Sequence, residues 1–245
     1  EMRAFIDECN EAFPDSIARK IPEIPEVLTT EFIATQLPFI AKQRDLIFAG
    51  LDYSSVEPVL FDVNTMGVLG VCGRAKSGKS NFVNHILESI KEKNSASKIY
   101  VIDDITRKYS SYDGQCEKYA IDASAIEEIL TEWEAELSNR YNLLMERKSD
   151  ALDKSGMLVL VINNQDVASA IAANSGLLAK YKTITGKYKN LKMCIIYANL
   201  ANENIQYASP EPIKMIKENR NVVLFDDLVN FKSFEITSSR RCYGK

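Results

Sequence analysis

The stretch from Gly73 to Ser80 holds the residues best suited to chemistry. Its sequence, Gly-Arg-Ala-Lys-Ser-Gly-Lys-Ser, fits the pattern G-x-x-x-x-G-K-[ST], in which a glycine-rich loop surrounds phosphate groups. The glycines let backbone N–H groups turn inward, a lysine reaches the outer phosphates, and a hydroxyl ligates Mg²⁺. The pattern therefore predicts a triphosphate site, with Lys79 on the phosphates and Ser80 on the metal.

A strand before this loop and a helix after it must hold the loop in place. Residues 67–72 form an apolar run typical of a buried strand, which ends directly at Gly73. From Phe82 to Ile90, apolar residues recur at helical spacing, and a helix N-terminus attracts anions. This order favours a nucleotide loop over an ordinary glycine turn. The predicted binding residues are Gly73, Arg74, Ala75, Lys76, Ser77, Gly78, Lys79, Ser80 and Asn81.

Further apolar runs predict the rest of the fold. Strands are expected at 98–104, 157–162, 191–197 and 221–225, and helices from Asp122 or Ser124 onward, at 167–183 and at 211–218. Strands that alternate with helices form parallel sheets covered on both faces. The predicted fold class is therefore α/β, a P-loop NTPase with a central, mainly parallel sheet flanked by helices.

The first part of the chain has a different character. Residues 1–20 predict a short amphipathic helix that ends near Pro14, and the prolines of Ile21–Pro25 predict an extended linker. Residues 45–51 and 56–63 predict a β-hairpin. We therefore expect a helix and linker at 1–44 and an ATPase-like domain at 45–245. A chain that starts without Met and stops on a basic tail is expected to be a piece of a longer polypeptide.

Acids are missing where nucleotide hydrolysis would need them. The buried strand 157–162 ends in Asn163 and Asn164, the positions where an acid for Mg²⁺ and a catalytic acid are expected. An amide has no negative charge and cannot take a proton near neutral pH. Loss of a general base costs about 10² to 10⁴ in rate, so we predict binding with weak or absent turnover. The alternative is that Asp166 or Asp103 supplies the acid.

Asn199 follows the strand that we expect between the phosphate loop and the strand 157–162. A polar side chain at this place can sense the γ-phosphate. An ordinary residue at the start of a helix is the alternative interpretation.

The composition limits the classes of partner. A net charge of −4, with 26% charged residues, gives no overall basic field, which makes nucleic acid an unfavoured partner. Five scattered cysteines without a C-x-x-C pair indicate free thiols in a reducing cytoplasm, and the single histidine excludes a His-rich metal site. No stretch approaches the roughly 20 apolar residues of a membrane span, although membrane attachment elsewhere in a longer polypeptide stays open.

The segments Gly50–Asp52, Pro58–Val63 and Gly67–Gly73 resemble the start of FtsK/SpoIIIE-type ATPase domains, which have a RecA/FtsK-like fold. The helix that closes on Asn139–Tyr141 and the Ile21–Pro25 linker are also similar, the linker resembling the joint between tandem domains of EssC/EccC-like proteins. These are membrane-anchored motors of type VII secretion in Gram-positive bacteria. The resemblance covers nearly the whole chain, and the best match is the last, C-terminal ATPase domain of such a protein. Only the phosphate loop is a sharp motif.

The resemblance implies a cytoplasmic domain of a cell-membrane protein that binds ATP and Mg²⁺. Implied partners are neighbouring ATPase domains, small helical WXG-type secreted proteins, and further copies in a hexamer. A degenerate domain of this kind is expected to regulate assembly or substrate recognition. Two departures stand out: Lys76 replaces a glycine common in the family's loop, and Asn163 and Asn164 replace the acidic pair.

Two other functions compete with this one. A DNA-translocating FtsK-like ATPase domain predicts basic pore loops and an intact acidic pair. A small-molecule kinase predicts a lid of arginines, for which Arg140 and Arg147 are the candidates.

Overall fold

Apolar runs form a parallel sheet in the part of the chain that the structure describes. The computed structural model describes residues 2–12, 25–36, 46–189, 191–201, 209–219, 221–225 and 242–243. The sheet contains β3 (Gly67–Gly73), β4 (Lys98–Ile102), β5 (Lys118–Ala120), β6 (Leu158–Asn163), β7 (Met193–Leu200) and β8 (Val222–Phe225). The strand order is β5-β4-β6-β7-β3-β8, with all pairs parallel, which confirms the predicted fold class.

Alternating side chains of the sheet build two separate apolar layers. In β6, Leu158, Leu160 and Ile162 belong to one buried cluster, whereas Val159 and Val161 belong to the other. This alternation follows from the two-residue period of a strand. Both faces of the sheet are therefore buried, as expected for a parallel sheet covered by helices.

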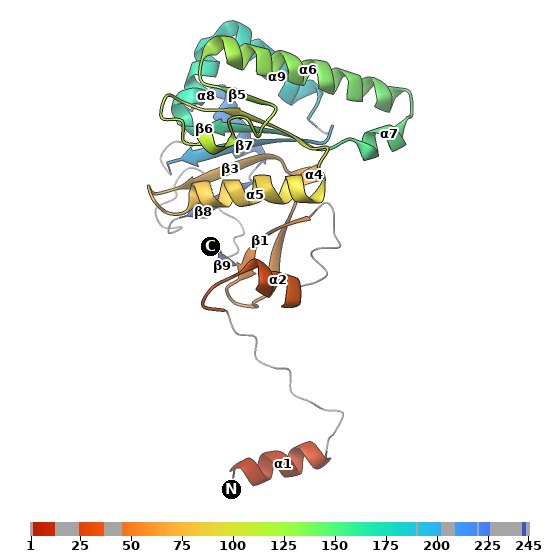
Figure 1. Ribbon diagram of the computed structural model, residues 1–245, viewed down its shortest axis with the longest axis vertical. Coiled ribbons are helices and arrows are strands. Elements are labelled where there is room, and N and C mark those ends of the chain that lie inside the picture. The colour runs from red at the N-terminus through yellow and green to blue at the C-terminus, as the bar shows by residue number, and fades with distance from the viewer. Residues whose placement is uncertain are drawn as a thin grey trace.

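The two layers are completed by different helices (Figure 1). One face is covered by α6 (Ala123–Met145), α8 (Asn164–Ala173), α9 (Ser175–Lys187) and α10 (Glu211–Asn219), and the other by α5 (Lys79–Lys93). Shorter helical segments are α2 (Thr30–Gln36), α4 (Val63–Met66), η1 (Ser110–Tyr112) and α7 (Ser149–Lys154). The phosphate loop therefore connects β3 in the sheet to α5, the longest described helix on its face.

Side-chain caps explain where two of the helices begin. Asp122 caps α6 by accepting a 3.0 Å hydrogen bond from the backbone of Ala125, so Asp122 and not Ser124 starts this helix. Asn174 accepts from the backbone of Gly176 and of Leu177 at the start of α9. The helical region predicted at 167–183 contains two helices, because Asn174 separates α8 from α9.

A small antiparallel sheet packs against α5. It contains the predicted hairpin of β1 (Leu46–Asp52) and β2 (Pro58–Asp62), and β9 (Cys242–Tyr243) pairs with β1. His85 of α5 donates from Nε2 to the carbonyl oxygen of Phe48 at 2.7 Å, and the rings of Phe61 and Phe82 meet edge to face. These contacts link the hairpin to the helix that follows the phosphate loop.

The N-terminal helix α1 (Met2–Ala12) has the predicted amphipathic pattern. It has no buried residue and lies apart from the other labelled elements in Figure 1. Of the predicted linker, only Pro25 is described, and the boundary expected between residues 44 and 45 lies outside the described residues.

Candidate functional site

The phosphate loop lies at the carboxyl end of β3, where β8 runs beside it. Gly73 has a φ of 143°, and a Cβ added there would lie 2.6 Å from the carbonyl oxygen of Phe225. Gly78 has a φ of 102° at the point where α5 begins. Both glycines therefore occupy backbone conformations that other residues rarely adopt, and Gly73 also has no room for a side chain.

Lys79 points back into the loop from the first turn of α5. Its side chain is buried, and Nζ donates to the carbonyl oxygens of Gly73, at 2.5 Å, and of Arg74. The ammonium thus lies inside the arch of the loop, next to the helix N-terminus. Burial raises the pKa of the neighbouring Cys72 thiol to about 12, while the Lys79 charge acts in the opposite direction, so Cys72 stays a neutral thiol near pH 7.

Two further residues show how the loop suits a phosphate ligand. Lys76 has a φ of 62°, the left-handed conformation that a glycine would adopt without strain. Ser77 Oγ is buried and has no hydrogen-bond partner among the described residues. An orphaned hydroxyl, a helix N-terminus and a buried ammonium in one loop fit a triphosphate group.

Three of the predicted site residues meet at the carboxyl edge of the sheet. Ser80 Oγ donates to Asn199 Oδ1 at 3.1 Å, and Asn199 Nδ2 donates to Asn163 Oδ1 at 2.6 Å. The strand β7, which carries Asn199, lies between β3 and β6, as predicted from the sequence. Asn199 has a φ of 56°, a left-handed conformation that asparagine tolerates better than most residues.

Asp103 lies behind these amides and is only 1% exposed. Its carboxylate accepts from Asn163 Nδ2 at 2.6 Å, from the Tyr119 hydroxyl at 2.6 Å, and from the backbone N–H groups of Asp104 and Tyr109 at 2.8 Å. Burial, together with the hydrogen bond to Asp103, raises the pKa of Tyr119 above its usual range, so this hydroxyl remains a donor. The carboxylate is thus surrounded by donors and has no direct contact with the phosphate loop in the described structure.

Asn164 is turned away from Ser80 and toward a second acid. Its Nδ2 donates to Asp104 Oδ2 at 2.5 Å, and its Oδ1 accepts from the backbone of Val167. Burial acts to raise the pKa of Asp104, but hydrogen bonds from Thr106 and Asn164 outweigh it and lower the pKa below the usual value. Asp104 is therefore ionised near pH 7 and is half-buried, which leaves part of it accessible to solvent.

The other candidates are placed less centrally. Asp166 is exposed in the first turn of α8, and Asn81 is exposed on α5. Tyr109, which the sequence did not single out as functional, is buried, and its hydroxyl accepts from Asn199 Nδ2 at 3.2 Å and interacts with Ser80. Its only signal in the sequence was an aromatic residue in the loop that follows β4.

No cluster of three His, Cys, Asp or Glu side chains that could hold a metal ion exists within the described residues. A cation at this edge would instead use the Ser80 hydroxyl together with oxygens of a bound nucleotide. This is the arrangement that Mg²⁺ usually adopts with phosphate ligands, because it needs few protein ligands and keeps several waters.

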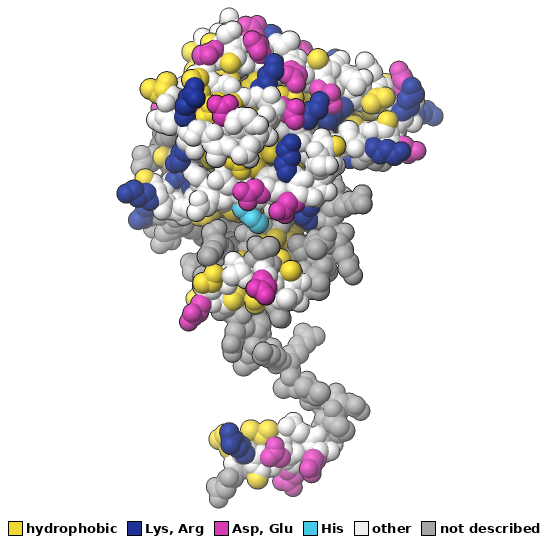
Figure 2. All heavy atoms as spheres, viewed as in Figure 1, with side chains coloured by type: hydrophobic (Ala, Val, Ile, Leu, Met, Phe, Trp, Pro, Cys, Tyr) yellow, Lys and Arg dark blue, Asp and Glu magenta, His cyan; other side chains and the backbone are white. Residues whose placement is uncertain are grey.

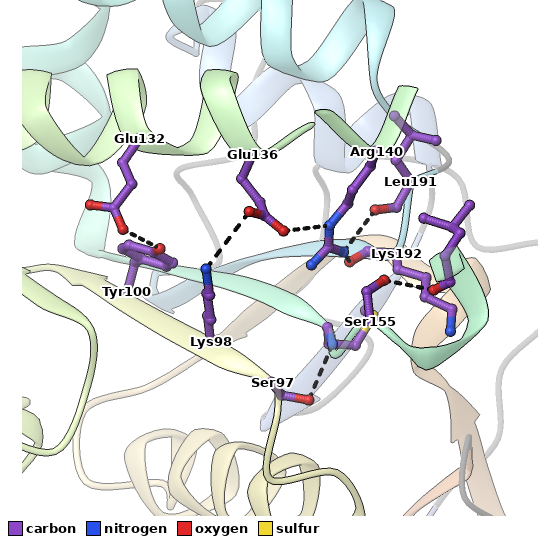
Figure 3. A network of polar contacts seen from close by, with 11 residues as sticks. Ser97, Lys98, Tyr100, Glu132, Glu136, Arg140, Ser155, Leu191 and Lys192 are labelled. Carbon is purple, nitrogen blue, oxygen red and sulfur yellow. Dashed lines mark hydrogen bonds and ion pairs between the residues drawn. The ribbon is translucent and has the colours of Figure 1, made fainter. Parts of the chain in front are cut away.

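Arg140 lies at the opposite edge of the sheet. Its buried guanidinium donates from Nη1 to the carbonyl oxygens of Leu191 and Lys192, just before β7 begins, and from Nε to Glu136 at 3.1 Å (Figure 3). Asn199 and Ser80 meet near the other end of β7. Arg140 therefore fastens α6 to the sheet and is not a phosphate-binding lid residue.

A cavity of about 510 Å³ also opens at this opposite edge, between the start of β3, the last turns of α9, and α10. Lys182, Lys189 and Lys214 lie along it together with Glu211 and Glu218. It is separate from the phosphate loop, because it lies at the amino ends of β3 and β7.

The sequence matches the family model described as the FtsK/SpoIIIE family over residues 40–196. The chain belongs to the FtsK/SpoIIIE family. The match includes the phosphate loop, Asp103, Asn163 and Asn164, and it ends three residues before Asn199. None of the curated proteins matches this FtsK/SpoIIIE chain in sequence.

Solved structures of EssC and EccC domains have the same fold. The cytoplasmic domain of EssC has 20% identity and a TM-score of 0.73, over 96% of this chain and 46% of that one. EssC (ATPases 2 and 3) from Geobacillus thermodenitrificans has 20% identity and a TM-score of 0.70, over 96% and 44%. Thermomonospora curvata EccC (ATPases 2 and 3), in complex with a signal sequence peptide, has 21% identity and a TM-score of 0.60, over 90% and 40%. The chain thus spans less than half the length of these structures.

A helix that crosses a bilayer needs roughly 20 consecutive, mostly apolar residues. None of the described helices combines the length and apolar character needed to cross a bilayer.

Proposed function

We propose that this chain is an ATP-binding, hydrolysis-impaired domain of a membrane-anchored type VII protein-secretion motor. The observation that carries the proposal is the contrast between two neighbouring strand ends. The loop after β3 presents Lys79, Ser80 and a helix N-terminus, whereas β6 ends in the amides Asn163 and Asn164. The loop thus has the residues that a phosphate-binding site needs, whereas no carboxylate contacts Ser80 among the described residues.

The loop offers groups of the kinds that bind the triphosphate of ATP. Lys79 would balance the charge of the outer phosphates, and backbone N–H groups from Ala75 to Ser80 would donate to their oxygens. Ser80 would provide the protein ligand for Mg²⁺, and Asn199, in contact with Ser80, would sense the γ-phosphate. When bound, Mg²⁺ neutralises charge on the phosphates; the residues of this chain bind and orient them.

Weak turnover follows from the two amides. Neither Asn163 nor Asn164 can accept a proton from water, and loss of a general base costs about 10² to 10⁴ in rate. Asp103 is buried with four donors around it, so it cannot reach a water molecule at the loop. Asp104 is accessible, but it is held by Asn164 and Thr106.

The partners that we propose follow from the similar structures. Two of these contain linked ATPases 2 and 3, and one of them holds a signal sequence peptide. We infer that this chain is one ATPase domain in a cytoplasmic row of such domains in a Gram-positive bacterium. In this arrangement ATP binding would regulate either the assembly of copies into a hexamer or the recognition of small helical WXG-type secreted proteins.

The first test removes the ammonium in the loop. We expect Lys79→Ala to abolish ATP binding measured by calorimetry, because it removes the buried ammonium that lies against Gly73 and Arg74 of the loop. Lys91→Ala, at the other end of α5, is the matched control and should bind ATP as the wild type does. An unchanged ATP affinity in Lys79→Ala would rule out the proposed site.

Turnover provides the second half of this test. The wild-type chain should release phosphate well below about 1 s⁻¹, the lower end of typical enzyme turnover. A wild-type rate at or above that value would mean that the amides after β6 do not limit hydrolysis.

A further inference from the structure

A line of hydrogen-bonded side chains crosses neighbouring strands and ends at the phosphate loop. Asp103, after β4, accepts from Asn163 Nδ2 at 2.6 Å. Asn163 Oδ1 then accepts from Asn199 Nδ2 at 2.6 Å, and Asn199 Oδ1 accepts from Ser80 Oγ at 3.1 Å. We call these four residues the polar line. It connects a buried carboxylate with the proposed metal ligand across β4, β6 and β7.

Asp103 determines the direction of every hydrogen bond in the polar line. Both carboxylate oxygens accept hydrogen bonds, from two backbone N–H groups and the Tyr119 hydroxyl, so Asn163 turns its NH₂ group toward Asp103. The oxygen of Asn163 then faces Asn199, so Asn199 must donate to it from its own NH₂ group. This leaves the oxygen of Asn199 facing Ser80. An amide oxygen can only accept, so Ser80 is the donor at its contact with Asn199.

The direction of the Ser80 proton matters for metal binding. With the proton directed toward Asn199, the lone pairs of Oγ remain available for a cation. If the two amides were turned the other way, Asn199 would donate to Ser80, and the hydroxyl proton would be free to point toward the cation. A carboxyl group that lies two side chains away thus influences which side of the hydroxyl the metal meets.

The carboxylate lies one strand farther from the loop than in P-loop proteins that hydrolyse nucleotides, where an Asp near the loop helps to hold Mg²⁺. Here Asn163 has that place and Asp103 stands behind it. We propose that Asp103 is a positioning residue for Mg²⁺-dependent nucleotide binding, acting through Asn163 and Asn199 on the Ser80 hydroxyl. This inference rests on the proposed ATP binding. It identifies Asp103 as the residue that makes ATP binding sensitive to Mg²⁺.

The experiment compares ATP affinity with Mg²⁺ present and with Mg²⁺ removed by a chelator. In the wild type, Mg²⁺ should tighten binding. In Asp103→Asn, this ratio of affinities should fall by about 2- to 10-fold, the effect expected of one hydrogen bond, while Mg²⁺-free affinity stays the same. Asp113→Asn is the matched control, because Asp113 is an exposed acid in the same loop. Its ratio should equal that of the wild type.

A charge swap separates positioning from a general structural role. Asn163→Asp alone would place two carboxylates at the 2.6 Å contact, and we expect a lower melting temperature. The double variant Asp103→Asn with Asn163→Asp restores one amide and one carboxylate at this contact. The new carboxylate still makes Asn199 present its NH₂ group, so the Mg²⁺ ratio should rise above that of Asp103→Asn and approach the wild-type ratio.

Melting temperatures show which variants are folded before affinities are compared. A folded Asp103→Asn protein with the wild-type Mg²⁺ ratio would overturn the inference. So would a folded double variant whose ratio is as low as that of the single variant. If the wild type binds no ATP with or without Mg²⁺, the proposed function fails first, and the inference fails with it.

Discussion

The contact between Asn164 and Asp104 determines whether an acid can be introduced beside the phosphate loop. Asn164→Glu would place a second carboxylate near Asp104, whose lowered pKa keeps it ionised, and it would put Glu at a φ of 59°. We therefore expect little gain in phosphate release from this variant alone. Combined with Asp104→Asn, which removes the repulsion, release should rise toward the factor of about 10² expected of a general base. Equal rates in the two variants would contradict this role of Asp104.

Single residues of the site differ in how far the sequence could place them. Lys79 and Ser80 follow from a local pattern, and the amides Asn163 and Asn199 follow from the ends of apolar strands. The contact between Asp103 and Asn163 joins residues 60 positions apart. It depends on β4 lying next to β6, which the amino-acid pattern does not specify. Asp103 could therefore be named as an alternative acid, but not as the partner of Asn163.

Among the elements, α6 depends on Arg140 for its attachment to the sheet. Arg140→Met would remove the hydrogen-bond donor from the carbonyl oxygens of Leu191 and Lys192. It would also remove the ion-pair partner of Glu136. We expect the free energy of unfolding to fall by about 2 to 4 kcal/mol in urea denaturation. Glu128→Ala, on the exposed side of α6, should change it by less than about 0.5 kcal/mol. ATP affinity should not change in either variant; a selective loss of affinity in Arg140→Met would favour the kinase alternative.

The strands could be predicted from the sequence where apolar residues follow one another without a break. The strands β3, β4, β6, β7 and β8 are uninterrupted apolar runs, and their positions were predicted to within a few residues. The edge strand β5 was missed because Lys118–Ala120 is three residues long and only Ala120 is fully buried. The pairing of β9 with β1 joins segments about 190 positions apart, so no local pattern could indicate it.

At the scale of the whole molecule, the net charge bears on whether the partner is a protein or DNA. The net charge is −4, and the face in Figure 2 mixes Lys and Arg with Asp and Glu side chains. We expect affinity for duplex DNA weaker than about 10⁻⁴ M at physiological salt, measured by fluorescence anisotropy. Affinity in the micromolar range that falls steeply between about 50 and 200 mM salt would instead support a DNA translocase.

The pairing of β9 with β1 has a mechanical consequence. Because Leu51 pairs with Tyr243 and Asp52 with Cys242, segments from the two ends of the domain lie antiparallel and side by side. A pulling force attached before Leu46 and after Tyr243 would peel this short pair apart one bond at a time, because antiparallel neighbours pulled from the same end unzip. Under such a force this two-residue pair would separate before the longer ladders of the parallel sheet.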